Sequence, residues 1–149
     1  MSLDYNFRIA TELEPERVLA VVFHSLELRL DTGASGEEVE GRGFLLTASA
    51  VAPKSREMVE EALGFSPSVD LQFWLDDSER RVAMAAMLRG VLAVLHQVPG
   101  DATLLCGGDT VLLLRREGQL ILDSGTGAWT PERLASVDAL YEMRQLPSL

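Results

Sequence analysis

The sequence predicts an α+β fold, with one domain, a mostly antiparallel sheet, a long buried central helix and two or three further helices packed on it. Three observations lead to this prediction. Residues 3–10 and 69–75 alternate apolar and polar side chains, as half-buried strands do. Residues 78–97 form a long, mostly apolar helical stretch. Three short apolar segments after residue 100 are joined by turns too short for crossover helices, so they are expected to pair antiparallel.

In the first half of the chain, turn and helix-terminus residues mark the element boundaries. Pro15 suits the first turn of a helix, where its missing N–H does no harm. Gly64 stands where a left-handed residue would close a second helix that Ser55 caps. Residues 31–43 are rich in Gly and Glu without periodicity and are expected to be a loop. We expect strands at 3–10, 26–30, 44–50 and 69–75, and helices at 15–25 and 55–63.

The long helix at 78–97 begins after a run of acidic residues. Asp76 and Glu79 stand three residues apart, and negative charge suits a helix N-terminus. The helix is apolar nearly all round, which predicts a central, buried position. Its narrow face of small residues favours close packing on the sheet, and the alternative is a seam between two copies of the chain. This face consists of Ala83, Ala86, Gly90 and Ala93.

The last third of the chain is expected to form a meander followed by one helix. Strands at 103–106, 111–115 and 120–123 are joined by tight turns whose glycines can adopt positive φ. Thr130 and Pro131 suit a helix start, and that helix is expected to end near residue 140. The tail at 141–149 is expected to be irregular, since Pro147 blocks regular structure.

Composition and charge exclude several classes of protein. The 149 residues include 13 Lys and Arg against 23 Asp and Glu, which gives a net charge of −10. The apolar content of 47% excludes disorder as the main state, and the acidic balance argues against a nucleic-acid partner. The longest apolar stretch, 82–98, contains Arg89 and His96 and is not expected to span a membrane. Without a signal-peptide pattern, and with a single cysteine, the chain is expected to be cytoplasmic.

The search for catalytic chemistry favours a protein that is not an enzyme. The sequence has no phosphate-binding glycine motif and no nucleophile elbow. His24 and His96 fall near helix C-termini, where a structural role is favoured, and they cannot by themselves hold a metal. Cys106 is more typical of a core residue than of a reactive thiol. Asp76 and Asp77 could form an acid–base pair, but helix capping explains them. We expect no cofactor, no metal and no catalytic residue.

Acidic residues gather in two segments and predict a surface for a basic protein partner. Residues 1–80 carry 16 acidic and 7 basic side chains, whereas residues 81–149 are nearly balanced. Trp74 lies on the polar side of its strand, and an exposed Trp is a frequent interface anchor, although a covering helix would explain it equally well. A solvated acidic face is the plainer interpretation of the charges. The candidate contact residues are Glu37, Glu38, Glu40, Asp70, Gln72, Trp74, Asp76 and Asp77.

Several segments of the sequence carry a family resemblance. They are DYNFRIATELEPERVL, SREMVEEALGFSPSV, MLR before an apolar helix, PGDA, VLLLRREGQL, WTPERL and YE…LP. These segments resemble the third branch of the Sit immunity proteins, which accompany toxins passed between neighbouring bacterial cells. The resemblance covers nearly the whole chain and depends mostly on packing and turn residues. Two segments depart from the pattern: Gly107-Gly108-Asp109 replaces an Asn-Gly-Glu hairpin, and Asp76-Asp77-Ser78 stands where a basic or aromatic residue is expected.

The resemblance implies a binding function: an immunity protein would neutralise a cognate toxin domain by covering or holding it. The acidic composition suggests that such a toxin is basic. The alternative is a small-ligand-binding or regulatory domain that acts as a homodimer through the small-residue face. A third, weaker hypothesis is an enzyme that uses Cys106 or the pair Asp76 and Asp77.

Overall fold

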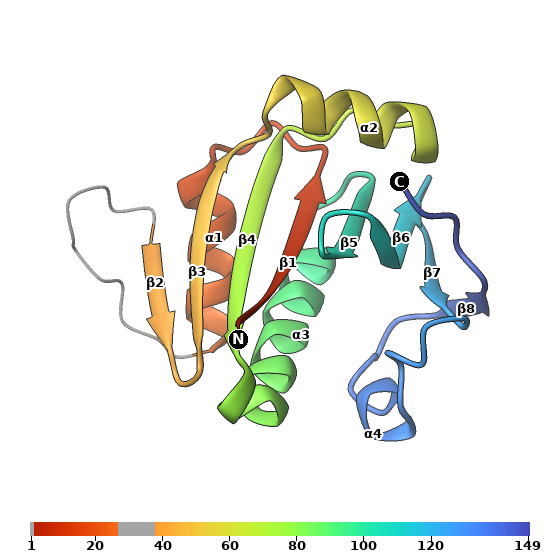
Figure 1. The fold of residues 1–149 in the computed structure, drawn as a ribbon. Helices are drawn as coiled ribbons and strands as arrows, with labels where there is room; N and C mark the ends of the chain where they lie inside the picture. Colours follow the sequence, from red (N-terminus) through yellow and green to blue (C-terminus); the bar gives the residue numbers. More distant parts are fainter. Residues whose placement is uncertain (1, 27–37) are drawn as a thin grey trace.

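The part of the chain that the structure describes is organised around one continuous eight-stranded sheet, with strand order β2-β3-β4-β1-β5-β6-β7-β8 (Figure 1). The computed structural model describes residues 2–26 and 38–149. Every neighbouring pair of strands is antiparallel except β7 and β8, which are parallel. This arrangement confirms the α+β class with a mostly antiparallel sheet. The strands are β1 (Ser2–Ile9), β2 (Glu38–Gly41), β3 (Phe44–Ala50), β4 (Val69–Asp76), β5 (Ala102–Cys106), β6 (Thr110–Arg116), β7 (Gln119–Asp123) and β8 (Tyr141–Arg144).

Two helices, α1 (Pro15–Ser25) and α3 (Arg80–Gln97), lie side by side against one face of the sheet (Figure 1). The opposite face is only partly covered, by α2 (Pro53–Leu63) and the last residues of the chain. A 3₁₀ turn, η1 (Asp77–Glu79), leads into α3, and α4 (Pro131–Leu134) follows β7. As predicted, Pro15 lies at the start of α1, and Gly64 closes α2 with a φ of 82°.

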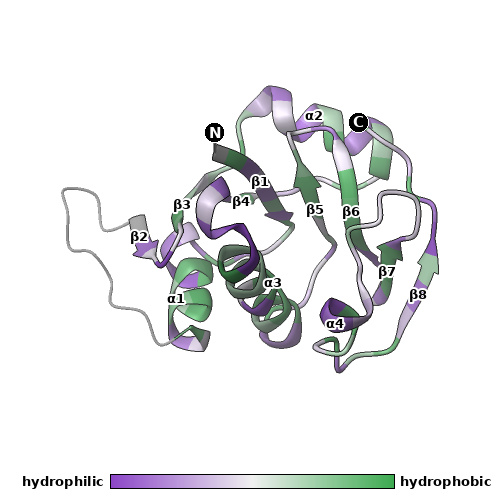
Figure 2. Ribbon diagram, turned by 60° about the horizontal axis from the view of Figure 1, so that its bottom comes forward, coloured by the Kyte–Doolittle hydropathy of each residue, from purple (hydrophilic) through white to green (hydrophobic). Residues whose placement is uncertain are grey.

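The main core lies between the sheet and the pair α1 and α3. Alternate residues of the central strands enter it, and Phe7, Leu71 and Phe73 are completely buried. Hydrophobic residues are prominent in α3 and in strands β5 to β7 in Figure 2. A second cluster lies under α2 on the other face, where Val59 and Leu63 contact residues of β5 and β6. The long helix α3 is buried on one side only, because Arg81, Val82, Ala85 and Arg89 are exposed.

The small-residue face of α3 is used inside the chain. A Cβ atom added at Gly90 would lie 2.7 Å from Cγ1 of Val22 in α1, so glycine permits the close approach of these two helices. Gly90 and Ala83 are buried, and Ala86 and Ala93 are half-buried. The predicted homodimer seam through this face is therefore not supported, since α1 already occupies the position nearest Gly90.

Four predictions differ from the structure. Ser55, expected to cap the second helix, lies inside α2, which begins at Pro53 after the N-cap residue Ala52. Glu38–Gly41, placed in a loop by the sequence, pairs with β3 as β2. The helix expected to reach residue 140 ends at Leu134, where Ser136 donates a hydrogen bond to the Arg133 carbonyl and competes with helix continuation. Tyr141–Arg144, expected to be irregular, forms β8 against β7. Residues 27–30 of the strand predicted at 26–30 lie outside the described residues.

Candidate functional site

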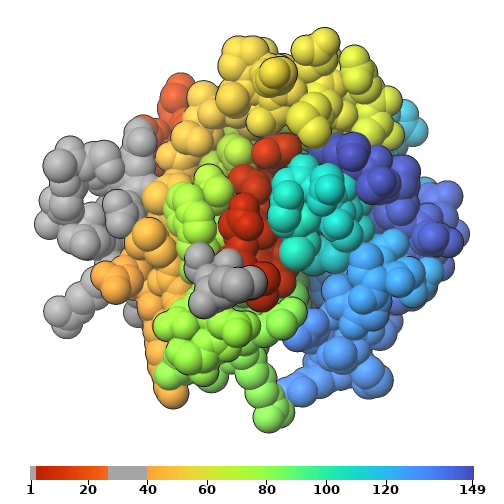
Figure 3. Space-filling view, viewed as in Figure 1, coloured from red at the N-terminus to blue at the C-terminus, as the bar shows by residue number. Residues whose placement is uncertain are grey.

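The sheet face turned away from α1 and α3 is the candidate site, and we call it the open face. In Figure 3 its central strands β1 and β4 remain visible between α2, the edge strands and the hairpin after β5. Strand alternation places polar and half-buried side chains here, opposite the buried set. On three adjacent strands, the open face consists of Asp4, Asn6 and Arg8 from β1, Leu45, Thr47 and Ser49 from β3, and Asp70, Gln72 and Trp74 from β4.

Trp74 lies at the centre of one row that crosses four strands. It stands opposite Leu45 on β3 and Asp4 on β1, and Leu45 in turn stands opposite Glu40 on β2. Trp74 and Leu45 are half-buried, and Glu40 is exposed. Directly opposite residues share a face and their Cβ atoms lie about 5 Å apart, so the row presents an apolar pair between two carboxylates. Trp74 therefore lies between the two alternatives that the sequence left open, an exposed side chain and one covered by a helix.

A buried polar cluster lies further along the same face. The Asn6 side-chain nitrogen donates a hydrogen bond to one oxygen of Asp70 at 3.0 Å, and Nε of Arg8 lies 3.4 Å from the other oxygen. Asn6 and Arg8 are 6% and 7% exposed. The negative charge of Asp70 is thus balanced within the protein. Asp70 is therefore held in place by two neighbouring side chains of the open face.

The carboxylates of Asp76 and Asp77 are exposed at the end of β4. Asp76 accepts hydrogen bonds from the backbone N–H and the hydroxyl of Ser78, at 3.0 and 2.9 Å. These bonds, the backbone one foremost, lower the pKa of Asp76. The capping role predicted for Asp76 is therefore present, and both charges face solvent near the Trp74 row.

The structure brings together most of the described candidate residues. Gln72 lies between Asp70 and Trp74 on the polar side of β4, and Glu40 joins the Trp74 row. Glu37 lies outside the described residues, and for Glu38 only the backbone in β2 is described. Sequence reasoning missed Asp4, Leu45, Asn6 and Arg8. Strand alternation signalled their side of the strand, but not their neighbours across the sheet.

Comparison with known families shows which family the chain belongs to. A family model described as SitI3-like matches residues 3–133, which is most of the sequence. The chain belongs to the SitI3-like family. No curated protein and no solved structure matches the chain. The match spans β1 to α4, so every described residue of the open face lies inside the SitI3-like region.

Cys106, His24 and His96, the side chains considered for catalysis, lie at or near the ends of β5, α1 and α3. Cys106 is half-buried against the main core, and His24 and His96 are exposed in the last turns of α1 and α3. The pKa of Tyr5 is raised, chiefly by burial and further by Cys106, while Arg80 opposes the rise. Within residues 2–26 and 38–149, no group of three or more His, Cys, Asp or Glu side chains could hold a metal ion. None of the helices described is long and apolar enough to cross a membrane.

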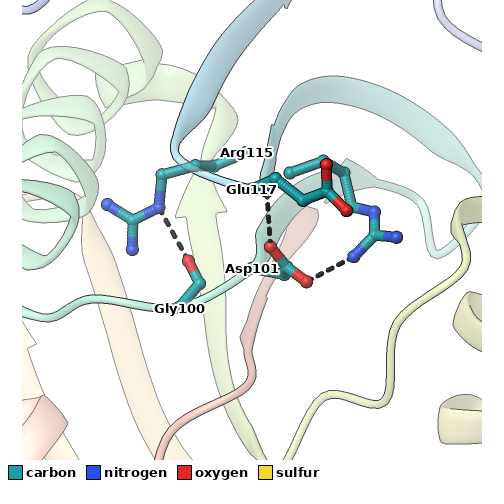
Figure 4. Close-up of polar contacts among 5 residues, drawn as sticks. Gly100, Asp101, Arg115 and Glu117 are labelled. Atoms are coloured by element: carbon teal, nitrogen blue, oxygen red, sulfur yellow. Dashed lines mark hydrogen bonds and ion pairs between the residues drawn. The ribbon is translucent and has the colours of Figure 1, made fainter.

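A second charged cluster of this chain fastens the end of α3 to the hairpin of β6 and β7. The guanidinium of Arg115 donates to the carbonyls of Leu95, Val98 and Gly100, at 2.5, 2.6 and 2.7 Å. Asp101 accepts from the backbone N–H of Glu117 at 2.9 Å and pairs with Arg116 (Figure 4). The charged groups of this cluster form hydrogen bonds with each other and with the free carbonyls at the end of α3. We therefore assign the cluster a structural role.

A groove lies on the opposite side from the open face, between α3 and the segment around α4. Its volume is about 1260 Å³. Val82, Ala85 and Leu92 supply apolar surface, while Arg89 and His96 are among its charged and titratable side chains. The groove offers apolar surface together with polar groups, as ligand sites do.

Proposed function

We propose that this SitI3-like protein is a non-enzymatic immunity protein that binds and neutralises a cognate, basic bacterial toxin domain in the cytoplasm. The family name supports a role in toxin immunity. The net charge of −10 suits a basic partner, because complementary charge speeds encounter and selects against wrong partners. The observation that carries the proposal is the row in which half-buried Trp74 and Leu45 lie between Asp4 and Glu40.

The proposed contact surface has an apolar centre and an acidic rim. Trp74 and Leu45 form the centre, where a large side chain that is already half-buried can be fully desolvated by a partner. Asp4 and the exposed carboxylates around it form the rim, where charges act mainly on the association rate. The surface comprises the predicted residues Glu37, Glu38, Glu40, Asp70, Gln72, Trp74, Asp76 and Asp77, with Asp4 and Leu45 added.

Asp70 and Asp76 have different roles in this proposal. Because Arg8 and Asn6 hold the Asp70 carboxylate, it fixes the floor of the surface and contributes little net field. Asp76 and Asp77 are exposed, so their charges reach a partner through solvent and should be screened by salt. We therefore expect the salt dependence of toxin binding to come from the acidic rim and not from the apolar centre.

The test is protection and binding with the candidate toxin. The toxic domain encoded by the neighbouring gene is expressed in a sensitive host with and without this protein, and binding is measured at two salt concentrations. We expect rescue, and tighter and faster binding at low salt. Trp74→Ala should weaken binding by about 30-fold, the scale of an interface hot spot. Asp76→Lys with Asp77→Lys should lower mainly the association rate.

Matched controls separate the surface from general damage. Leu13→Ala removes an exposed apolar side chain elsewhere. Glu12→Lys with Glu16→Lys makes the same charge change at the start of α1, which lies against the other face. Both controls should bind and protect like the wild type. If Trp74→Ala combined with the reversed charges binds normally, the proposed surface is wrong. If the wild type neither binds nor protects, the immunity function is wrong for this toxin domain.

The groove supports one alternative, a small-ligand-binding or regulatory domain. Its apolar surface with nearby Arg89 and His96 suits a ligand that is apolar with a polar or acidic end. Thermal unfolding with a panel of such ligands tests this function, since a ligand bound only by the folded state raises the melting temperature. Ala85→Trp, which would fill part of the groove, should abolish the rise and leave toxin binding unchanged.

A further inference from the structure

The β8 edge of the sheet has an unusual surface. β8 pairs with β7 on one side only, and all four of its residues are exposed. Leu140 just before it is 97% exposed, and Tyr141 and Met143 are 40% exposed each. These three account for half of the large hydrophobic side chains that are exposed among the described residues. An edge strand with apolar side chains and unpaired backbone groups is a template for another strand.

The direction of the backbone groups in β8 follows from its pairing. The carbonyl of Arg144 accepts a hydrogen bond from the backbone N–H of Ser124, so the backbone of residue 144 faces the β7 side. Successive residues of a strand point their N–H and C=O groups to alternate sides. The backbone of Glu142 therefore also faces β7, and those of Tyr141 and Met143 point outward from the sheet.

We propose that β8 pairs antiparallel with β8 of a second copy of this chain, centred on Met143. In this register Met143 stands opposite the partner's Met143, an outward-pointing position that allows two N–H···O=C bonds. Glu142 then stands opposite the partner's Arg144, and Arg144 opposite the partner's Glu142. Each copy thus supplies both charges of a complementary set, and the contact is isologous, as a two-fold dimer requires.

The two edges of the sheet differ in this self-complementarity. The sequence of β2, EVEG, carries two acidic residues and no basic residue, so pairing between two β2 strands would oppose like charges. The sequence of β8, YEMR, carries one charge of each sign. Within the chain, Glu142 and Arg144 already lie 3.7 Å apart. Because β8 is short, its pairing would bury less than the roughly 1,200–2,000 Å² of a stable interface, and we expect a weak dimer that dissociates on dilution.

The decisive experiment exchanges the charges. Glu142→Arg and Arg144→Glu each turn both cross-strand charge pairs into like-charge pairs, so each should raise the dimer dissociation constant by about tenfold or more. An equal mixture of the two variants should form a heterodimer, because arginines of one then face glutamates of the other. Sedimentation velocity over a wide concentration range at low salt measures each association. The double exchange E142R/R144E should dimerise like the wild type.

Amide hydrogen exchange on the wild-type protein gives an independent measurement. Raising the protein concentration should protect the outward amides of Tyr141 and Met143 and leave that of Arg144 unchanged. A wild-type protein that stays monomeric at its highest soluble concentration would overturn the proposal. It is also overturned if the single variants associate like the wild type, or if the mixture does not recover association. Melting curves of the variants establish that they are folded; both altered side chains are about half exposed.

Discussion

The two faces of the sheet are built from the same strands but have opposite physical character. On β4, Leu71 and Phe73 point toward α1 and α3 and are completely buried, whereas Gln72 and Trp74 point to the open face and are half-buried. The first face is apolar along its whole length. The second carries a buried ion pair, an apolar pair and several exposed carboxylates. Stability is therefore expected to depend on the covered face, and recognition on the open face.

The largest effect is expected on the covered face, at Phe73. Phe73→Ala would remove a ring from the main core and leave a cavity, because the surrounding strands and helices can relax only partly. We expect a loss of about 3–5 kcal/mol in the free energy of unfolding. Urea unfolding measures it, with Phe73→Leu as a control that should cost less than about 1.5 kcal/mol. A small loss of unfolding free energy in Phe73→Ala would contradict the proposed division, in which stability depends on the covered face.

The next effect concerns the ion pair of Arg8 and Asp70 on the open face. Arg8→Met alone leaves the carboxylate of Asp70 uncompensated and should cost about 2–3 kcal/mol, somewhat less than for a fully buried pair. Arg8→Met with Asp70→Leu removes both charges and should be less destabilising than Arg8→Met alone. A double-mutant cycle measured by urea unfolding gives the coupling free energy. Additive effects would mean that the pair does not order the open face.

Local sequence signals predicted the strands that carry both faces. Alternation in 3–10 and 69–75 placed the buried and polar sides of β1 and β4 correctly, and Gly64 marked the end of α2. The missed strands are both edges. Glu38–Gly41 and Tyr141–Arg144 are only four residues long, and what makes them strands is pairing with β3 and β7. The β8 partner lies some twenty residues earlier in the chain, so no local pattern could indicate it.

The candidate site was predictable in its residue types and not in its arrangement. The polar parity of Trp74 and Asp70 followed from alternation alone. Their neighbours depend on strand order: β4 lies between β3 and β1, and this places Leu45 and Asp4 beside Trp74. The pairing of Asp70 with Arg8 depends on the same topology. The long helix α3 was expected to be central and buried, but the sheet and α1 cover only one side of it, and the other side lines the groove.

A smaller, pH-dependent effect is expected at Asp123, which is buried at the end of β7. Its carboxylate accepts backbone hydrogen bonds from Gly125, Thr126 and Leu146. Burial alone would raise its pKa, but these bonds outweigh it, and the pKa is lowered. The carboxylate therefore contributes stability above its ordinary pKa near about 4, and this contribution is lost as the pH falls through its lower value in the folded protein.

Asp123→Asn tests this contribution. At neutral pH we expect a loss of about 1–2 kcal/mol in the free energy of unfolding, since an amide accepts these bonds less strongly than a carboxylate. The difference from the wild type should shrink as the pH is lowered below about 4. Chemical unfolding at a series of pH values measures it. Phe73→Leu on the covered face is the control, and its difference from the wild type should not change with pH. A pH-independent deficit in Asp123→Asn would contradict the assigned role of the carboxylate.

The smallest effect on stability is expected at Trp74, one residue from Phe73 on the same strand. Trp74→Ala removes a half-buried ring whose main cross-strand neighbour is Leu45, and such pairs contribute about 0.2–1 kcal/mol. We therefore expect the free energy of unfolding to fall by about 1 kcal/mol or less, while toxin binding falls by about 30-fold. Urea unfolding and binding are measured on the same preparation. If Trp74→Ala destabilises the protein as much as Phe73→Ala, Trp74 is a core residue and the open face is not a recognition surface.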